Sequence, residues 1–220
     1  EQQRSIDSAR AMDEYLRDIY DRKLADPDDG IFSALIAAEH DGDQLTKNEV
    51  ISNIRLLYIA GHETTTNLIG NGLVELFRHP DQLEMVRRSD EHDANLVEEV
   101  LRFNSPVQMT RRIPDHDIEV DGTTIPGGSV ILLCAVSANR DPRKWGPTGD
   151  EFDITRADAK DQLSFGGGAH FCLGAALARL EGQIAIPRIV RRFPNLSLAA
   201  EPVFEPRVVL RGVSALEVTV

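Results

Sequence analysis

The chain has 220 residues, with 24 basic against 36 acidic side chains and a formal net charge of −12. So acidic a balance argues against nucleic acid as a partner, and a hydrophobic fraction of 41% is typical of a folded rather than a disordered protein. No apolar run reaches the roughly 18 residues that a membrane-spanning helix needs.

The chain contains two cysteines, Cys134 and Cys172. Their number allows one disulfide, but two cysteines in a chain this long favour a reducing compartment, so we predict a cytoplasmic protein. The chain begins at Glu1 without an initiator Met or a signal peptide. That beginning is typical of a mature product or of a fragment cut within a helix.

Helices are predicted for the first third of the chain. Apolar residues recur at helical spacing between residues 5 and 24, turn residues at 26–30 interrupt the pattern, and a short helix is expected at about 31–39. Thr46 and Glu49 then have the spacing of a capping box. Because no proline follows before Phe77, the sequence allows a helix of roughly 30 residues, about 45 Å long.

The middle of this long helix carries residues that are poor helix formers, AGHETTTN at 60–67. Glu63 lies at the edge of a face that is shared by Leu57, Ala60, Gly61, Thr64 and Leu68. Poor helix formers in the middle of an otherwise well-formed helix indicate a function. The alternative is a Ser/Thr-type cluster beside a solvent-facing acid.

The rest of the chain mixes helices with short strands. Helices are predicted from Pro80 and between Asn95 and Pro106, followed by strand-like runs at 107–113, 117–120, 123–128 and from 129, and by an irregular loop at 144–162. Pro187 is expected to kink or nearly end the last helix. The tail, 196–220, is predicted to form short strands and a hairpin. The fold class is therefore mainly α with small β-sheets.

The loop FGGGAHFCLG, residues 165–174, precedes a predicted helix that begins at Ala175. A free cysteine is most often a buried structural residue, but one at a helix start is also a candidate nucleophile or metal ligand. Zinc requires three or four ligands, whereas His170 is the only close neighbour of Cys172, and nothing specifies a second histidine for a Cys–His nucleophile. A thiolate as the sole protein ligand points to haem.

The pattern formed by Phe165, Gly168, Cys172 and Gly174 resembles the haem-binding loop of the cytochrome P-450 family, the haem-thiolate monooxygenases. Further motifs of that family occur in the same order, namely Ala60-Gly61-His62-Glu63-Thr64-Thr65, Glu99-Val100-Leu101-Arg102, and Arg112 ahead of Asp117 and Gly122. The resemblance runs from about residue 5 to the C-terminus, and family members are about twice as long. Residues 1–220 are thus similar to the C-terminal, haem-binding part of a single soluble, bacterial-type cytochrome P-450 domain, with the N-terminal half absent.

The resemblance implies haem b as the cofactor, with its iron ligated by the Cys172 thiolate. Glu63 and Thr64 would be the catalytic pair that relays the protons dioxygen needs before its O–O bond breaks. Arg112 and His170 would pair with the haem propionates. The other cofactor-binding residues that the resemblance implies are Ala60, Gly61, Phe165, Gly166 and Gly174.

The resemblance gives Glu99 and Arg102 a supporting role in place of a catalytic one. Three residues apart on a helix, the two side chains share a face and can pair. In the family a third basic residue from the irregular segment completes a buried network. The sequence departs from the family here, because Glu151 stands where many relatives have Arg. Arg156 and Arg140 are the two candidates for the third partner.

The function implied is insertion of one oxygen atom from O2 into an apolar organic substrate. Electrons would come from NAD(P)H through a ferredoxin and a ferredoxin reductase. Alternatives are a peroxygenase of the same fold driven by hydrogen peroxide and a non-catalytic haem-binding fragment. The substrate contacts implied by the resemblance are Val107, Gln108, Met109 and the helix face near Ile59.

Four arginines follow the cysteine along its helix and beyond, Arg179, Arg188, Arg191 and Arg192. One interpretation is that cations are favoured near a helix C-terminus. The other, implied by the family, is a docking patch for an acidic ferredoxin.

Overall fold

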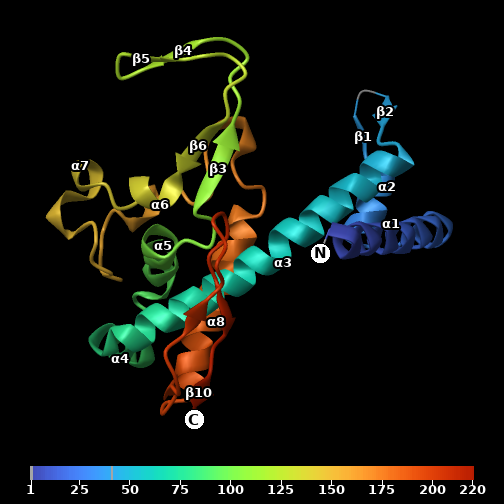
Figure 1. The fold of residues 1–220 in the computed structure, drawn as a ribbon. Coiled ribbons are helices and arrows are strands. Elements are labelled where there is room, and N and C mark those ends of the chain that lie inside the picture. Colours follow the sequence, from blue (N-terminus) through green and yellow to red (C-terminus); the bar gives the residue numbers. More distant parts are fainter. Residues whose placement is uncertain (1, 41) are drawn as a thin grey trace. The chain divides into compact units, whose positions relative to one another are not determined.

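The computed structural model describes residues 2–40 and 42–220 (Figure 1). The chain divides into two compact units, of which the first ends at His62 and the second is Glu63–Val220. Both units are mainly helical, and all the described strands form small two-stranded sheets. The predicted fold class is confirmed.

The first unit contains α1 (Gln2–Ala25), α2 (Ile31–Ala37), the antiparallel strands β1 (Glu39–His40) and β2 (Asp43–Gln44), and the start of α3 (Lys47–Arg78). Its small core consists of Leu16, Phe32, Val50 and Ile51. The predicted capping box is present, because the Thr46 amide donates to Glu49 Oε2 at 2.8 Å and the Glu49 amide donates to Thr46 Oγ1 at 3.3 Å. The predicted long helix is confirmed at 32 residues.

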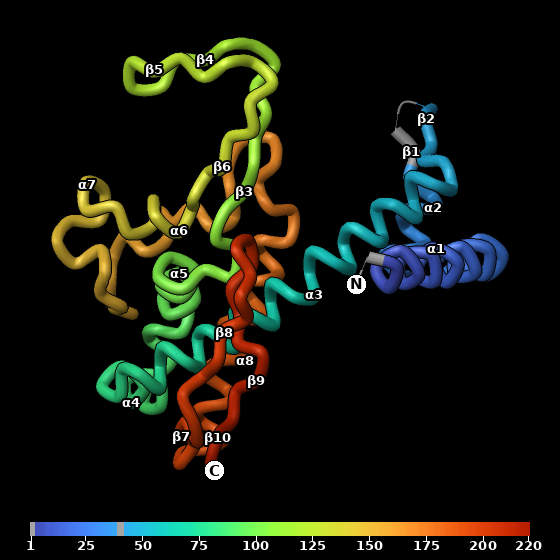
Figure 2. The backbone as a smooth tube through the Cα atoms, viewed as in Figure 1, coloured from blue at the N-terminus to red at the C-terminus, as the bar shows by residue number. Residues whose placement is uncertain are grey.

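The second unit is larger. Beyond the rest of α3, its helices are α4 (Pro80–Arg88), α5 (Asp93–Phe103), α6 (Ala135–Ala138), α7 (Pro142–Trp145) and α8 (Ala175–Arg192). Its strands are β3 (Met109–Arg112), β4 (Ile118–Val120), β5 (Thr123–Ile125), β6 (Ile131–Cys134), β7 (Ser197–Leu198), β8 (Val203–Phe204), β9 (Val213–Ala215) and β10 (Val218–Thr219). They pair antiparallel as β3–β6, β4–β5, β7–β10 and β8–β9, and Figure 2 shows the β4–β5 hairpin projecting beyond β3 and β6.

The core of the second unit is built where α3, α4, α5 and α8 meet. Glycines allow the helices to approach closely: a Cβ on Gly182 of α8 would lie 3.1 Å from a methyl group of Val97 on α5. The buried apolar residues of this core are Leu68, Leu73, Leu76, Leu83, Val86, Leu96, Val97, Val100, Leu101, Phe152, Ile154, Ile186 and Val190.

Of the two effects predicted for Pro187, a kink or a near end of the helix, the near end is wrong. Helix α8 continues to Arg192 with Pro187 inside it. Proline removes one backbone hydrogen bond, but Ile186 and Val190, on either side of Pro187, are both fully buried in the core. Burying these side chains offsets the lost bond, because each contributes roughly 1.5–3 kcal/mol.

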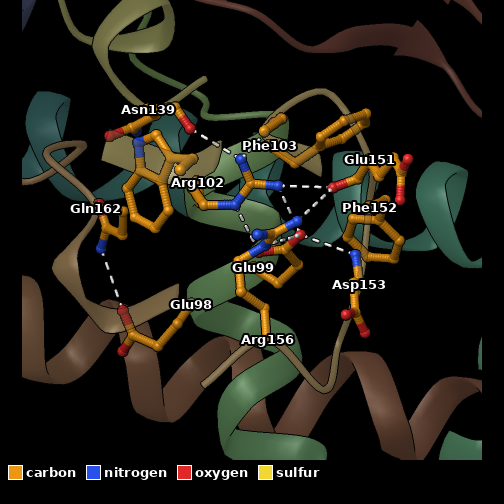
Figure 3. Close-up of polar contacts among 12 residues, drawn as sticks. Glu98, Glu99, Arg102, Phe103, Asn139, Glu151, Phe152, Asp153, Arg156 and Gln162 are labelled. Carbon is orange, nitrogen blue, oxygen red and sulfur yellow. Dashed lines mark hydrogen bonds and ion pairs between the residues drawn. The ribbon is translucent and has the colours of Figure 1, made fainter. Parts of the chain in front are cut away.

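A buried arginine on α5 ties this helix to the irregular segment that follows α6 (Figure 3). Arg102 is fully buried, and all five of its N–H donors are used. Nε and Nη2 donate to the two carboxylate oxygens of Glu99, each at 2.7 Å. The other donors reach the backbone carbonyls of Asn139, Gly149 and Glu151 at 2.7–2.8 Å.

Arg156, and not Arg140, is the third basic residue of this network. Arg156 Nε lies 3.5 Å from Glu99 Oε1. Arg140 instead donates from Nε to the Phe103 carbonyl at 3.1 Å and stacks on the Phe103 ring. Glu151, which stands where many relatives have Arg, contributes its backbone carbonyl to the network rather than a side-chain charge.

Hydrogen bonds carry the network on to the segment ahead of Phe165. The Asn139 side chain accepts from the Leu163 amide at 2.8 Å and donates to Ser164 Oγ at 2.9 Å. Ser164 Oγ in turn donates to the Leu101 carbonyl of α5 at 2.6 Å. The start of the glycine-rich loop is therefore fixed to the same helix that carries Arg102.

A polar stripe on α3, the residues Glu63, Asn67, Asn71 and Glu75 spaced four apart, faces the chain near β9. Asn71 Nδ2 donates to the Arg211 and Asn104 carbonyls, both at 3.0 Å. A Cβ on Gly212 would lie 1.9 Å from Asn67 Oδ1, so only glycine fits there without movement of Asn67. The tail is thus held directly against α3.

We expect Arg102→Leu to lower the free energy of unfolding by about 3–5 kcal/mol, because it leaves Glu99 buried without its main partner. Urea denaturation measures the loss. Arg143→Gln is the matched control, since Arg143 forms an exposed ion pair with Asp141 on α7. Equal stability of Arg102→Leu and the control would contradict the proposed role of the network.

We expect Gly212→Ala to destabilise the protein by about 1–3 kcal/mol through overpacking against Asn67. The double variant Gly212→Ala/Asn67→Ala lacks the clash. It should therefore be nearly as stable as Asn67→Ala alone. Thermal and urea unfolding of the variants check both expectations. If Gly212→Ala costs as much stability in the Asn67→Ala background as in the wild type, the close contact between the tail and α3 is wrong.

Candidate functional site

The glycine-rich loop forms a closed turn ahead of α8. Gly166 and Gly168 have φ values of 73° and 68°, a left-handed backbone that glycine adopts without strain. The Cys172 amide donates to the Phe165 carbonyl at 3.0 Å and closes the loop. Helix α8 begins at Ala175, so the predicted position of Cys172 just before a helix N-terminus is confirmed.

The thiol of Cys172 is free and partly accessible, and so is that of Cys134, so the allowed disulfide is not formed. Gly174, the N-cap of α8, has no capping side chain, and a Cβ there would lie 4.0 Å from the sulfur. The N-terminus of α8 favours a negative charge at this position. No group of three metal-binding His, Cys, Asp or Glu side chains occurs in residues 2–40 and 42–220, so within them Cys172 has no set of co-ligands.

A cationic hollow of about 490 Å³ opens beside this loop. It is lined by Arg111, Arg112 and Ile113 from the β3 region and by His170 from the loop. The side chain of Arg112 is held by hydrogen bonds from Nη1 to Thr110 Oγ1 at 3.1 Å and to the Arg111 carbonyl at 2.8 Å. The structure thus brings together Arg112 and His170, the two residues predicted to face propionates.

These residues fit a haem group. A cation-lined hollow suits a ligand that carries carboxylates, because charge-assisted hydrogen bonds from Arg are strong. The accessible thiol of Cys172, two residues beyond His170, is the kind of single ligand that haem iron accepts. Arg111 lines the hollow as well, so the choice of Arg112 over Arg111 rests on motif spacing and stays a prediction.

Phe165 is held at the start of the loop by a cation–π contact. The Arg179 guanidinium lies 4.5 Å from the centre of the Phe165 ring and forms an ion pair with Glu98 of α5. Arg191 pairs with Asp93 at 2.7 Å. Two of the four arginines predicted to form a docking patch are therefore partnered within the chain, and Arg188 and Arg192 are the remaining candidates.

The acid–threonine motif lies on α3, as predicted. Ala60 and Gly61 belong to the first unit, and a side chain on Gly61 would meet no atom within 4 Å, consistent with the open space that the motif implies. Glu63 and Thr64 begin the second unit. The approach of these four residues to a cofactor stays a prediction.

Glu63 forms an ion pair with Arg207, which lies between β8 and β9. Arg207 also pairs with Glu205 at 2.6 Å. The carboxylates of Glu63 and then Glu205 raise the pKa of the Arg207 guanidinium above its ordinary value. Sequence reasoning missed Arg207, because the segment that carries it has no motif and lies far from residue 63 in the chain.

No helix in the described ranges, 2–40 and 42–220, combines the length and the apolar character needed to cross a membrane.

Comparison with known proteins agrees with this geometry. The cytochrome P450 family profile matches residues 3–91 and 94–211. A vitamin D(3) 25-hydroxylase of Pseudonocardia autotrophica is 46% identical over 210 residues, which cover 93% of this chain and 52% of that protein. A biotin biosynthesis cytochrome P450 of Bacillus subtilis is 42% identical over 206 residues, covering 93% of this chain and 51% of the relative.

Solved structures show the same fold. CYP109E1 from Bacillus megaterium, crystallised with testosterone, superimposes with a TM-score of 0.93 at 33% identity and covers 99% of this chain and 60% of its own. P450BioI, in complex with an acyl carrier protein that carries hexadec-9Z-enoic acid, gives a TM-score of 0.91 at 42% identity, with 97% of this chain and 54% of that one covered.

The chain spans about half the length of the curated relatives it matches. Those relatives include hydroxylases, and the profile match takes in α3, α5 and the cysteine loop together. Since the match extends over nearly all of the described elements, the chain belongs to the cytochrome P450 family.

Proposed function

We propose that residues 1–220 are the haem-binding, C-terminal part of a single cytochrome P-450 domain. We further propose that the whole protein is a monooxygenase that acts on an apolar organic substrate. The observation that supports this best is the accessible Cys172 thiol at the N-terminus of α8, beside the hollow lined by Arg112 and His170. This combination offers one thiolate ligand and cations for two carboxylates.

The proposed reaction consumes one substrate C–H bond, one O2, two electrons and two protons, and it yields one hydroxyl group on the substrate and one water. Haem, when bound, would supply the chemistry that activates dioxygen, and the Cys172 thiolate would hold its iron. The electrons would come from NAD(P)H through a ferredoxin and its reductase, which keeps the balance of oxidant and reductant complete.

The chain's own residues would hold the cofactor and move the protons. Arg112 and His170 would neutralise the propionates and orient the ring. Glu63 would take up protons from water, and the Thr64 hydroxyl would pass them to the oxygen site. Gly61, which has open space around its Cα, would leave room for a small molecule at the helix.

The substrate class is inferred from the named relatives and from the residues after α5. A vitamin D(3) hydroxylase at 46% identity and a testosterone-bound structure at 33% identity both concern large apolar molecules. Val107, Gln108 and Met109 are partly buried, and Val107 bridges to Leu210. We propose that this segment forms one wall of the substrate pocket.

An acidic ferredoxin would dock at the exposed side of α8. A second hollow of about 490 Å³ lies there, lined by Gln183, Ile184, Pro187, Arg188, Arg191 and Arg192. Because Arg191 is already paired with Asp93, the charge available for steering comes from Arg188 and Arg192.

We expect the reduced, carbon monoxide-bound protein to show the strongly red-shifted Soret band of thiolate-ligated haem. Cys172→Ala should abolish this band, because it removes the thiolate that is proposed to hold the iron. Cys134→Ala is the matched control and should keep the band, since Cys134 ends strand β6 and does not belong to the cysteine loop at 165–174. A red-shifted band that survives Cys172→Ala would contradict the ligand assignment. An ordinary histidine-type band, or no haem uptake, would contradict the monooxygenase proposal for residues 1–220.

We expect Thr64→Ala to uncouple oxygen use from product formation, because the last group of the proton path is removed. The ratio of product formed to O2 consumed should fall several-fold while the haem content stays unchanged. Thr123→Ala, on the exposed strand β5, is the control and should leave the ratio at the wild-type value. The peroxygenase alternative would be favoured by two results together. The wild type would form no product with O2, and Thr64→Ala would form product normally with hydrogen peroxide.

A further inference from the structure

We propose that Arg207 is a positioning residue for Glu63: it holds the acid between proton transfers, and Glu205 serves as its alternate partner. This inference rests on the proposed function, since it concerns the acid of the proposed proton path. It adds the C-terminal segment between β8 and β9 to the elements that control that path.

The placement of Arg207 follows from the polar stripe on α3. Asn71 and Asn67, one and two turns ahead of Glu75, fix Arg211 and Gly212 of the tail against the helix. Arg211 is fixed further, because its Nε donates to Asn104 Oδ1 at 2.9 Å, while Asn104 donates to Glu75 Oε1 at 2.7 Å. The tail therefore runs along the stripe, and Arg207 meets Glu63 at its N-terminal end.

The backbone around Arg207 is also ordered by the tail itself. The Glu205 amide donates to the Gly212 carbonyl at 2.9 Å, and the Arg207 amide donates to the Glu205 carbonyl at 2.8 Å. The two ends of this loop are thereby linked to each other, and the neighbouring Arg211 carbonyl accepts from Asn71 of α3. A guanidinium carried on such a loop is presented to Glu63 with little further loss of conformational entropy.

Two carboxylates share one guanidinium here. Arg207 Nη1 contacts Glu63, and Nη2 contacts Glu205 at 2.6 Å. About four-tenths of the Glu63 side chain and nearly half of the Arg207 side chain are exposed, at 41% and 47%. Exposed pairs of this kind are individually weak, so Glu63 can leave Arg207 without a large energetic cost.

This arrangement suits a carboxylate that must move. When Glu63 takes a proton from water it becomes neutral, loses its attraction to Arg207 and is free to turn towards Thr64, the next residue on the helix. After it passes the proton on, it is again a carboxylate and returns to Arg207. Throughout, Glu205 keeps the Arg207 charge partnered, so that no step leaves an unpaired ion.

The first test measures coupling in the haem-loaded enzyme. We expect Arg207→Gln to lower product formed per O2 consumed several-fold, and Arg207→Lys to recover most of it. The double variant Glu63→Gln/Arg207→Gln should be no worse than Glu63→Gln alone, because both changes act on one path. An Arg207→Gln enzyme that stays fully coupled overturns the inference.

Arg78→Gln is the matched control, because Arg78 forms a second exposed ion pair between α3 and the tail, with Glu201. It tests whether loosening the tail anywhere along α3 is enough to affect coupling. We expect it to stay at the wild-type value. A loss equal to that of Arg207→Gln would mean a general structural effect and would overturn the positioning role.

The second test needs no haem. The side-chain nitrogen resonances of Arg207 in a nitrogen-15-labelled chain should shift in Glu63→Gln and again in Glu205→Gln, because each substitution removes one charged partner of the guanidinium. Arg207 resonances that Glu63→Gln leaves unchanged overturn the pairing in solution.

The outcomes separate this inference from the proposed function. If Glu63→Gln leaves coupling unchanged, the role of Glu63 in proton delivery is wrong and the inference falls with it. If Glu63→Gln uncouples the enzyme and Arg207→Gln does not, the proposed function stands and only the positioning role is overturned.

Discussion

The buried guanidinium of Arg102 is the interaction on which the second unit depends. A charge with no exposed surface is costly unless every donor is satisfied, and here Glu99 accepts two hydrogen bonds while three backbone carbonyls accept the rest. Those carbonyls come from the segment that runs from the end of α6 through α7 to Glu151. One side chain of α5 thus holds three separate points of that segment.

This constraint extends to the cysteine loop. Asn139 gives its carbonyl to Arg102 and its side chain to Leu163 and Ser164, so the same residue links the buried charge to the start of the loop. From Phe165 the loop closes on itself through the Cys172 amide. An ordered chain of hydrogen bonds therefore helps to set the position of the thiol, in a loop that is rich in glycine and exposes Leu173.

Local signals in the sequence predicted the long helices and the short motifs. The Thr46–Glu49 capping box, the start of α8 and the pairing of Glu99 with Arg102 each depend on residues within four positions of one another. Partner choice over long distances was not predictable in the same way. Arg156 and Arg140 were equivalent by composition, and only the path of the chain decides that Arg156 reaches Glu99. Similarly, nothing near residue 207 indicates a contact with α3. The extension of α8 past Pro187 depends on burial, which periodicity alone does not quantify.

The polar stripe on α3 has a consequence for how this part of the chain can vary in length. A single inserted residue between Glu63 and Glu75 would rotate everything beyond it by about 100°, so that the side chains facing the tail would no longer line up with it. Insertions in the tail between Arg207 and Gly212 would meet the same restriction, because both ends are held against the helix. Length variation among homologous chains should therefore be excluded from these two facing segments, which set each other's length.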